Sequence, residues 1–266
     1  MKIMVAVKQV AALDEDFTIR EDGRDVDADF LIRDLNEWDD FSLEEAVKIK
    51  EAAAEPVEII AVSVGPEEVD ESLRKCLAKG ADRAIRVWDL AVEGSDPIAI
   101  ARVLARVAKR EAVGMLFAGV QSSDQSFAAT GIATAAFLDW PHAAVISHLK
   151  YAPDAKSAVF RRELEGGLLH EVEIQCPAVL TIQLGINTPR YASLRSIKQA
   201  AAKPIEVLSP ADLGLAAGDV GEAGSSSRVR RMYMPDKGRA QLIEGDAAEK
   251  ALRLAAIIRE FQGDSA

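Results

Sequence analysis

The chain has 266 residues, of which 49% are hydrophobic and 28% charged, as in a globular protein large enough to bury a sizeable core. Acidic side chains outnumber basic ones 43 to 32, and the net charge of −11 argues against a nucleic-acid-binding surface, which needs clustered positive charge. Cys76 and Cys176 lie far apart without CxxC spacing, and no apolar run reaches the roughly 18 residues of a membrane span, so we expect a cytoplasmic protein with no disulfide, metal site or membrane insertion.

The N-terminal segment predicts a strand followed by a hairpin. Lys2–Val7 is rich in β-favouring residues and is too short for the apolar region of a signal peptide. Residues 17–20 and 30–32 flank an Asp22-Gly23 turn, which indicates a small hairpin.

Strands and helices then alternate as far as residue 149. The first helix follows the loop 35–40 and is expected near Ser42, because Ser42 and Glu45 form a capping box. Pro97 after Asp96 is typical of another helix start. This alternation predicts βαβ units, and therefore a parallel sheet with right-handed crossovers. The expected strands in this part are 57–64, 83–87, 113–117 and 143–149.

The pattern changes after residue 149. Residues 159–164 and 168–175 flank Glu165-Gly166-Gly167, which predicts a hairpin, and residues 178–184 predict a further strand. We therefore expect an α/β fold: an open, mostly parallel sheet with helices on both faces and added antiparallel strands.

The C-terminal part is less regular. A connection at 185–200 leads into a short helix expected at 194–202, and residues 214–227 are rich in Gly, Ala and Ser, which indicates a linker. A final helix has an apolar stripe from Ala247 to Phe261, which must be buried on its own domain or on a partner. The expected parts are an α/β nucleotide-binding domain, 1–213, and a linker with a helical arm, 214–266.

The stretch Val113–Gly131 carries the strongest functional signal. A buried strand ends at Gly119, a polar run extends from Gln121 to Ser126, and helical spacing begins after Phe127. This order presents backbone N–H groups and the positive end of a helix dipole to an anion such as phosphate. An ordinary capped connection is the alternative, because the stretch is neither a Walker A loop nor a GxGxxG motif.

Ligands of open parallel sheets bind beyond the carboxyl ends of the strands. Three segments are expected to converge there, and their order fits a mononucleotide with its phosphate at the last of them: Lys8–Asp16, Val64–Pro66 and Gly119–Ser126.

The sequence shows no catalytic constellation. None of its three histidines lies near a serine or cysteine in a nucleophile-elbow context, and Cys76 falls on the apolar stripe of a helix. This favours a binding protein over an enzyme, with an ATP-binding α/β enzyme or regulatory domain as the alternative. The histidines are His142, His148 and His170.

Several segments together resemble the β subunit of the electron transfer flavoproteins. The resemblance covers residues 1–213 and is weaker across 214–266. The wording NEWDDFSLEEA, AGVQSSDQSFAATG and RVRRMYMP is most similar to the methylotroph branch, whose usual electron donor is trimethylamine dehydrogenase or a relative. The matching segments are MVAVKQV, LNEWDDFSLEEAVKIKE, VSVGP, LAKGADRAIRV, the loop Gly119–Gly131, RRELEGGLLHEVEIQCPAVLTIQL and NTPRYASLRSIKQAAAKPIE.

The resemblance implies an electron carrier, not an enzyme, built as a heterodimer with an α subunit. The α subunit holds the redox-active FAD. The β subunit has a Rossmann-like, adenine-nucleotide-binding domain that holds a structural AMP and walls the flavin, and its C-terminal arm contacts α. A bifurcating type, with FAD in the nucleotide site of β, is the alternative within the family.

The resemblance also implies site residues. Leu13 and Trp38 would approach the flavin, and Tyr191, Leu194 and Arg195 would recognise a partner dehydrogenase. Many members carry three acids where this chain has Asp124-Gln125-Ser126, and Glu37-Trp38 and Val64 also depart from common family residues. The implied AMP contacts are Ala6, Asn36, Glu37, Trp38, Asp39, Val64, Gly119, Gln121, Ser122, Ser123, Asp124, Gln125, Ser126 and Thr130.

Overall fold

The computed structural model describes residues 1–12, 17–27, 31–152, 156–234, 238 and 240–263. Met1–Arg230 form one compact unit and Arg231–Ala266 a second, smaller one. The strands are β1 (Lys2–Ala6), β2 (Gln9–Ala12), β3 (Ile32–Leu35), β4 (Glu58–Val64), β5 (Arg83–Val87), β6 (Met115–Gly119), β7 (His142–Ala152), β8 (Ser157–Glu163), β9 (Leu169–Gln175), β10 (Ala178–Ile182) and β11 (Ile205–Leu208). The helices are α1 (Glu37–Ala52), α2 (Asp70–Lys79), α3 (Pro97–Glu111), α4 (Thr130–Leu138), α5 (Leu194–Ala202), α6 (Gly221–Gly224) and α7 (Ala247–Gly263).

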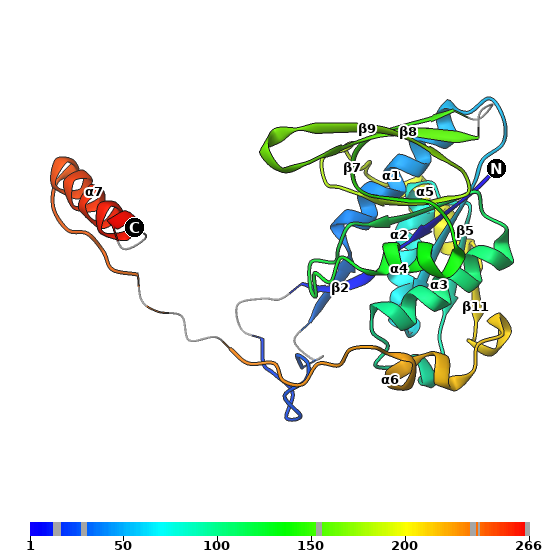
Figure 1. Ribbon diagram of the computed structural model, residues 1–266. Coiled ribbons are helices and arrows are strands. Elements are labelled where there is room, and N and C mark those ends of the chain that lie inside the picture. The colour runs from blue at the N-terminus through cyan, green and yellow to red at the C-terminus, as the bar shows by residue number, and fades with distance from the viewer. Residues whose placement is uncertain (13–16, 28–30, 153–155, 235–237, 239, 264–266) are drawn as a thin grey trace. The chain divides into compact units, whose positions relative to one another are not determined.

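Within the described residues, nine strands form one sheet in the order β11-β5-β4-β1-β6-β10-β7-β8-β9 (Figure 1). All neighbours pair in parallel except β7 with β8 and β8 with β9, so the expected α/β fold with added antiparallel strands is confirmed. From β1 the chain proceeds to β4 and β5 on one side and then crosses to β6 on the other. The strand order therefore reverses between β1 and β6, and such a switch point is where open sheets bind ligands.

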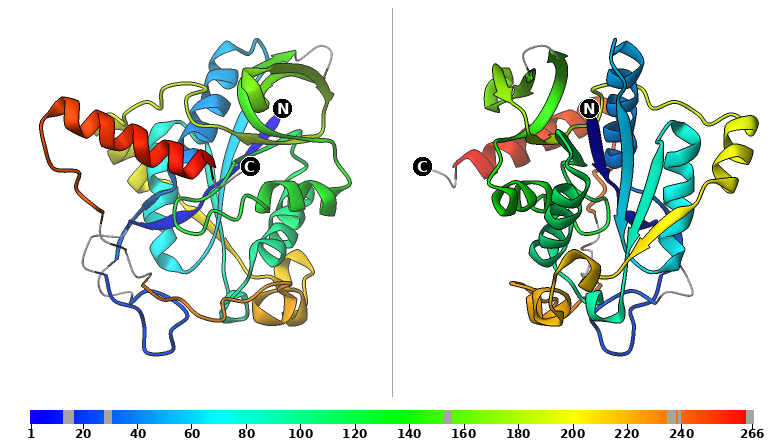
Figure 2. Two further views of the ribbon diagram at one scale, coloured as in Figure 1. Left: turned by 60° about the vertical axis from the view of Figure 1, so that its left-hand side comes forward. Right: turned by 90° about the vertical axis from the view of Figure 1, so that its right-hand side faces the viewer.

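Alternation along the strands gives the sheet two apolar faces. In β1, Ile3 and Val5 belong to a core packed under α1 and α2, whereas Met4 and Ala6 belong to the core under α3 and α4. Figure 2 (right) shows α3 and α4 on one side of the sheet and α2 and α5 on the other. Cys76 is fully buried in the first core, where burial raises the pKa of its thiol, so its expected core role is confirmed.

Two expectations near the N-terminus are wrong. Helix α1 begins at Glu37, so Ser42 lies one turn inside it, where its hydroxyl donates to the Trp38 carbonyl instead of capping. The expected turn at Asp22-Gly23 forms, but its second arm is 25–27, joined to 18–20 by an Ile19–Val26 bridge and by backbone hydrogen bonds. Of the arm expected at 30–32, Phe30 lies outside the described residues and Ile32 pairs instead with Ala12 in the β2–β3 ladder. The helix starts early because tertiary contacts at its N-terminal end replace a local cap.

The segment 214–227 is not a free linker. Val220 is buried, and the Asp96 carboxylate accepts hydrogen bonds from the backbone N–H groups of Ser226 and Ser227, both at 2.8 Å. Small residues here allow close packing beside α3. Strand β11, which the sequence pattern did not indicate, adds an edge to the sheet beside β5.

Helix α7 is the one helix in the described part of the second unit and has no buried residue. Its apolar side chains are exposed within that unit, including Leu252, Ile258 and Phe261. None of the helices in the described ranges is long and apolar enough to cross a membrane.

Candidate functional site

The candidate site lies at the carboxyl ends of β1, β4 and β6. Ala6, Val64 and Gly119 are the last residues of these three strands, which are neighbours in the sheet. The described parts of the three expected segments therefore meet at the switch point. Leu13 lies outside the described residues.

Asp39 joins the ends of β1 and β6. It lies buried in the first turn of α1, where Oδ2 accepts the Lys8 backbone N–H at 2.8 Å and Oδ1 accepts that of Gly119 at 2.9 Å. Burial raises the pKa of Asp39 from 3.8 to about 7, although the two N–H donors act in the opposite direction. Asp39 thus fixes the position from which the polar loop departs.

Asn36 holds the start of the loop that follows β6. It is buried at the N-cap position of α1 but makes no capping bond with its side chain. Its Nδ2 group donates to the Gln121 carbonyl at 2.9 Å, and its Oδ1 atom accepts the Ser123 N–H at 3.2 Å. Asn36 therefore occupies the N-cap position of α1, but its side chain holds a loop far along the chain.

Lys8 also holds the loop, and the sequence analysis did not single it out. Its Nζ atom lies 2.8 Å from both Asp124 carboxylate oxygens, 3.1 Å from Gln125 Oε1 and 3.3 Å from Ser122 Oγ. The ion pair joins residues 116 positions apart. Neither spacing nor composition could have indicated it.

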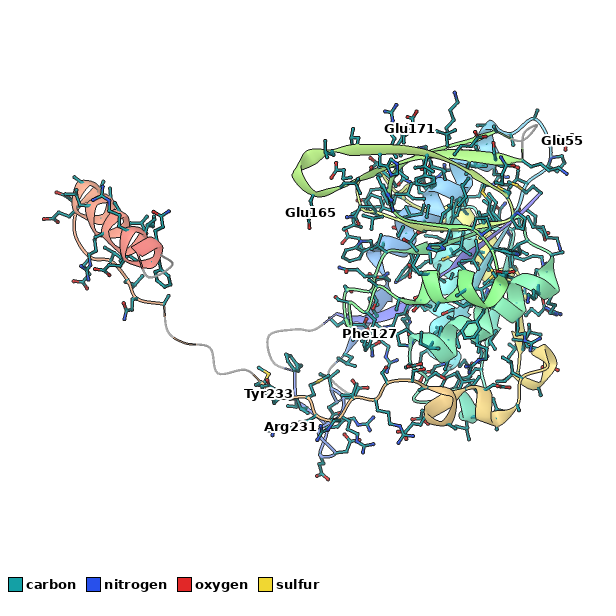
Figure 3. The ribbon with its side chains drawn as sticks, in the orientation of Figure 1. Glu55, Phe127, Glu165, Glu171, Arg231 and Tyr233 are labelled. Atoms are coloured by element: carbon teal, nitrogen blue, oxygen red, sulfur yellow. The ribbon has the colours of Figure 1, made fainter. Side chains whose placement is uncertain are left out.

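The loop ends at an uncapped helix terminus. Ser126 and Ala128 have φ angles of 52° and 51°, a left-handed conformation that costs energy in residues other than glycine. Ala129 occupies the N-cap of α4 and provides no side-chain acceptor for the first-turn N–H groups. These groups, together with the loop backbone, fit a phosphate. The loop side chain Phe127 is 49% exposed (Figure 3).

Trp38 lies directly beside Gly119. Its ring Nε1 donates to Gln183 Oε1 at 3.1 Å, and its side chain is half-buried, whereas Glu37 is exposed. A Cβ atom at Gly119 would come within 2.5 Å of both Trp38 Cβ and Asp39 Oδ1. Glycine at this position is therefore required by the packing of α1 against β6.

The segment 185–200 contains a second group of candidate residues. Tyr191 is 98% exposed and Leu194 81%, and Arg195 is also exposed. Arg190 anchors this segment to α1: its guanidinium contacts both carboxylate oxygens of the buried Glu44 and also Glu51. Tyr191 and Leu194 consequently do not fasten this segment to the unit, and they are available at its surface.

The comparisons with known proteins agree on one family. The electron transfer flavoprotein domain matches residues 32–213. The chain is 68% identical over 263 residues to the electron transfer flavoprotein subunit beta of Methylophilus methylotrophus, covering 99% of this chain and 100% of that protein. It is 38% identical over 217 residues to the corresponding human subunit, covering 81% of this chain and 84% of that protein. The chain therefore belongs to the electron transfer flavoprotein family, as a β subunit.

Proposed function

We propose that this β subunit binds AMP as a structural nucleotide at the ends of β1, β4 and β6. The carrying observation is that three side chains, Lys8, Asn36 and Asp39, hold the loop after β6 at the switch point of the sheet. The backbone N–H groups of the loop and of the first turn of α4 would bind the phosphate. Ala6 and Val64 line the adjacent strand ends, and Thr130 begins α4.

The same chain would form one wall of a flavin site. We propose a heterodimer in which an α subunit holds FAD, and FAD when bound supplies the electron-carrying chemistry. Trp38 supports this role, because it is half-buried and lies beside the start of the loop 120–129, called the nucleotide loop below. Leu13 is proposed as the second flavin neighbour from the resemblance alone.

Electrons would come from a primary dehydrogenase that recognises the segment 185–200. The exposure of Tyr191, Leu194 and Arg195 supports this proposal, because a few apolar or aromatic anchors supply most of the energy of an interface. Trimethylamine dehydrogenase or a relative is proposed as the donor from the resemblance of the sequence to the methylotroph branch alone. We propose a cytoplasmic location.

The second unit is proposed to dock on the α subunit. The exposed apolar side chains of α7 support this, since such a stripe is stable only when covered. The first unit ends at Arg230, so a chain truncated after that residue should keep its fold but lose affinity for α in co-purification. Undiminished recovery of α would contradict the proposal.

The nucleotide released from purified, denatured chain tests the proposed function, with its mass identifying the compound. AMP supports the structural role. FAD, together with a yellow colour of the chain expressed alone, would indicate the bifurcating type instead. ATP would indicate the nucleotide-dependent enzyme or regulatory domain.

A further inference from the structure

We propose that Lys8 is a positioning residue of the nucleotide loop, which neutralises Asp124 and ties the loop to the end of β1 so that the loop can accept a phosphate. The inference rests on the proposed function, because it concerns how the same site receives its ligand. It adds a charge requirement that neither the family match nor the sequence pattern supplies.

The argument begins with a conflict of charge. Asp124 lies in the polar run expected to face a phosphate, and two negative groups a few ångströms apart repel each other. The Asp124 side chain is only 20% exposed, so water screens its charge incompletely. A loop with a free carboxylate at this position would disfavour an anion.

Lys8 removes the conflict. Its ammonium bonds to both Asp124 oxygens, to Gln125 and to Ser122, so its three donors meet acceptors from three residues of one loop. The ammonium therefore neutralises the carboxylate and holds the side chains of Ser122, Asp124 and Gln125 close together.

The backbone of Lys8 is itself fixed. Its N–H donates to Asp39 Oδ2 at 2.8 Å, and its carbonyl accepts the Asn36 N–H at 2.9 Å. Asn36, at the N-cap of α1, and Asp39, in its first turn, hold the start of the loop and also the backbone of Lys8, whose side chain in turn holds Asp124. Lys8 thus belongs to the same framework and is not a freely moving surface charge.

This arrangement predicts a selective effect. If Lys8 is lost, Asp124 stays charged and unneutralised near the phosphate position, so a ligand with a phosphate is penalised and the same ligand without it is not. Neutralising Asp124 at the same time should relieve the penalty. A lysine that only stabilised the fold would affect both ligands alike.

The test uses the full chain, stripped of nucleotide, and measures calorimetric dissociation constants for AMP and for adenosine. The variants are Lys8→Met, Asp124→Asn and the double variant. The matched control is Lys75→Met, because Lys75 is 40% exposed against 41% for Lys8 and also pairs with an aspartate, Asp34, at 2.8 Å.

We expect Lys8→Met to weaken AMP binding by roughly tenfold or more, equivalent to about 1.4 kcal/mol, and to leave adenosine within about twofold. Adding Asp124→Asn should restore most of the AMP affinity, and Lys75→Met should change neither ligand. Equal losses for AMP and adenosine, no loss at all, or no recovery in the double variant would overturn the proposal.

Amide hydrogen exchange separates this inference from the proposed function. If the parent chain binds no AMP, the proposed function fails by itself. The loop contact is then judged by exchange in 121–129, which should become faster in Lys8→Met than in Lys75→Met. Equal exchange in the two variants would overturn the role of Lys8.

Discussion

Helix α1 supports two surfaces that differ in construction. At its N-terminal end, buried Asn36 and Asp39 hold the backbone at the start of the loop 120–129 by hydrogen bonds of 2.9 Å. Further along, Glu44 and Glu51 hold Arg190, which lies beneath a segment whose apolar side chains face outward. At the first surface, buried side chains hold the backbone of the loop in place, whereas the second surface presents exposed apolar side chains above a partly buried ion pair.

The difference suits the two proposed ligands. A permanently bound nucleotide is best held by a preorganised backbone that needs no rearrangement. A partner that must dissociate quickly is better served by a small contact with few anchors. Variants at the first surface should therefore change stability and nucleotide binding, and variants at the second should change partner binding.

The largest expected effect is at Gly119. Replacing it with valine forces atoms into the space occupied by Trp38 and Asp39, so the free energy of unfolding in urea should fall by about 3 kcal/mol. The resemblance implies that Gly119 contacts AMP, and the structure shows that packing against α1 is by itself enough to require glycine there.

Gly218 provides the control for this variant. A Cβ atom there would meet no atom within 4 Å, so Gly218→Ala should change stability by less than about 0.5 kcal/mol. Equal losses of stability at the two glycines would show that the contact between α1 and β6 does not cause the effect at Gly119.

Arg190→Ala tests how the second surface is held. It leaves the buried Glu44 without its bidentate partner, so we expect a loss of about 2 kcal/mol in urea unfolding. Arg161→Ala removes an exposed pair with Glu171 and should cost no more than about 1 kcal/mol. Similar values for the two variants would mean that Arg190 is only a surface charge.

Sequence analysis predicted the elements whose signals are local. The strand, polar loop and helix start between Val113 and Gly131 were predicted because each depends on a pattern of consecutive residues. The start of α1 was missed because the local Ser42/Glu45 pattern imitates a capping box, whereas the true N-cap residue, Asn36, uses its side chain to hold a loop 85 positions away. The Lys8–Asp124 pair and the packing of 214–227 depend on similarly distant contacts, which no local period reveals.

Leu194→Ala tests whether the second surface binds the partner dehydrogenase. It should weaken binding to the cognate dehydrogenase by roughly 1–3 kcal/mol, the value of one buried leucine side chain, without changing folding, nucleotide content or flavin spectrum. The measurement is the rate of flavin reduction at limiting carrier concentration. Leu90→Ala is the control, because Leu90 is 80% exposed and lies elsewhere. Reduction of the Leu194 variant at the parent rate would exclude this residue from recognition.

Asp39→Asn tests the first surface through the pH dependence of stability. Because the folded pKa of Asp39 is raised to about 7 from 3.8, the folded chain keeps a proton between these values that the unfolded chain has lost. This contribution to stability is therefore full at low pH and falls as pH rises towards 7, by at most about 1.4 kcal/mol per pH unit. Urea unfolding of both chains from about pH 5 to pH 8 tests it. Parallel curves would show that Asp39 does not titrate in this range.

The most direct test of the account is the thermal stability of the nucleotide-stripped chain with and without AMP. A ligand that binds only the folded state stabilises it by about 4 kcal/mol at a thousandfold excess over its dissociation constant, which corresponds to roughly 10 °C in a domain of this size. The account predicts such a rise with AMP in the parent chain and in Leu194→Ala alike. A melting temperature that AMP leaves unchanged would contradict it.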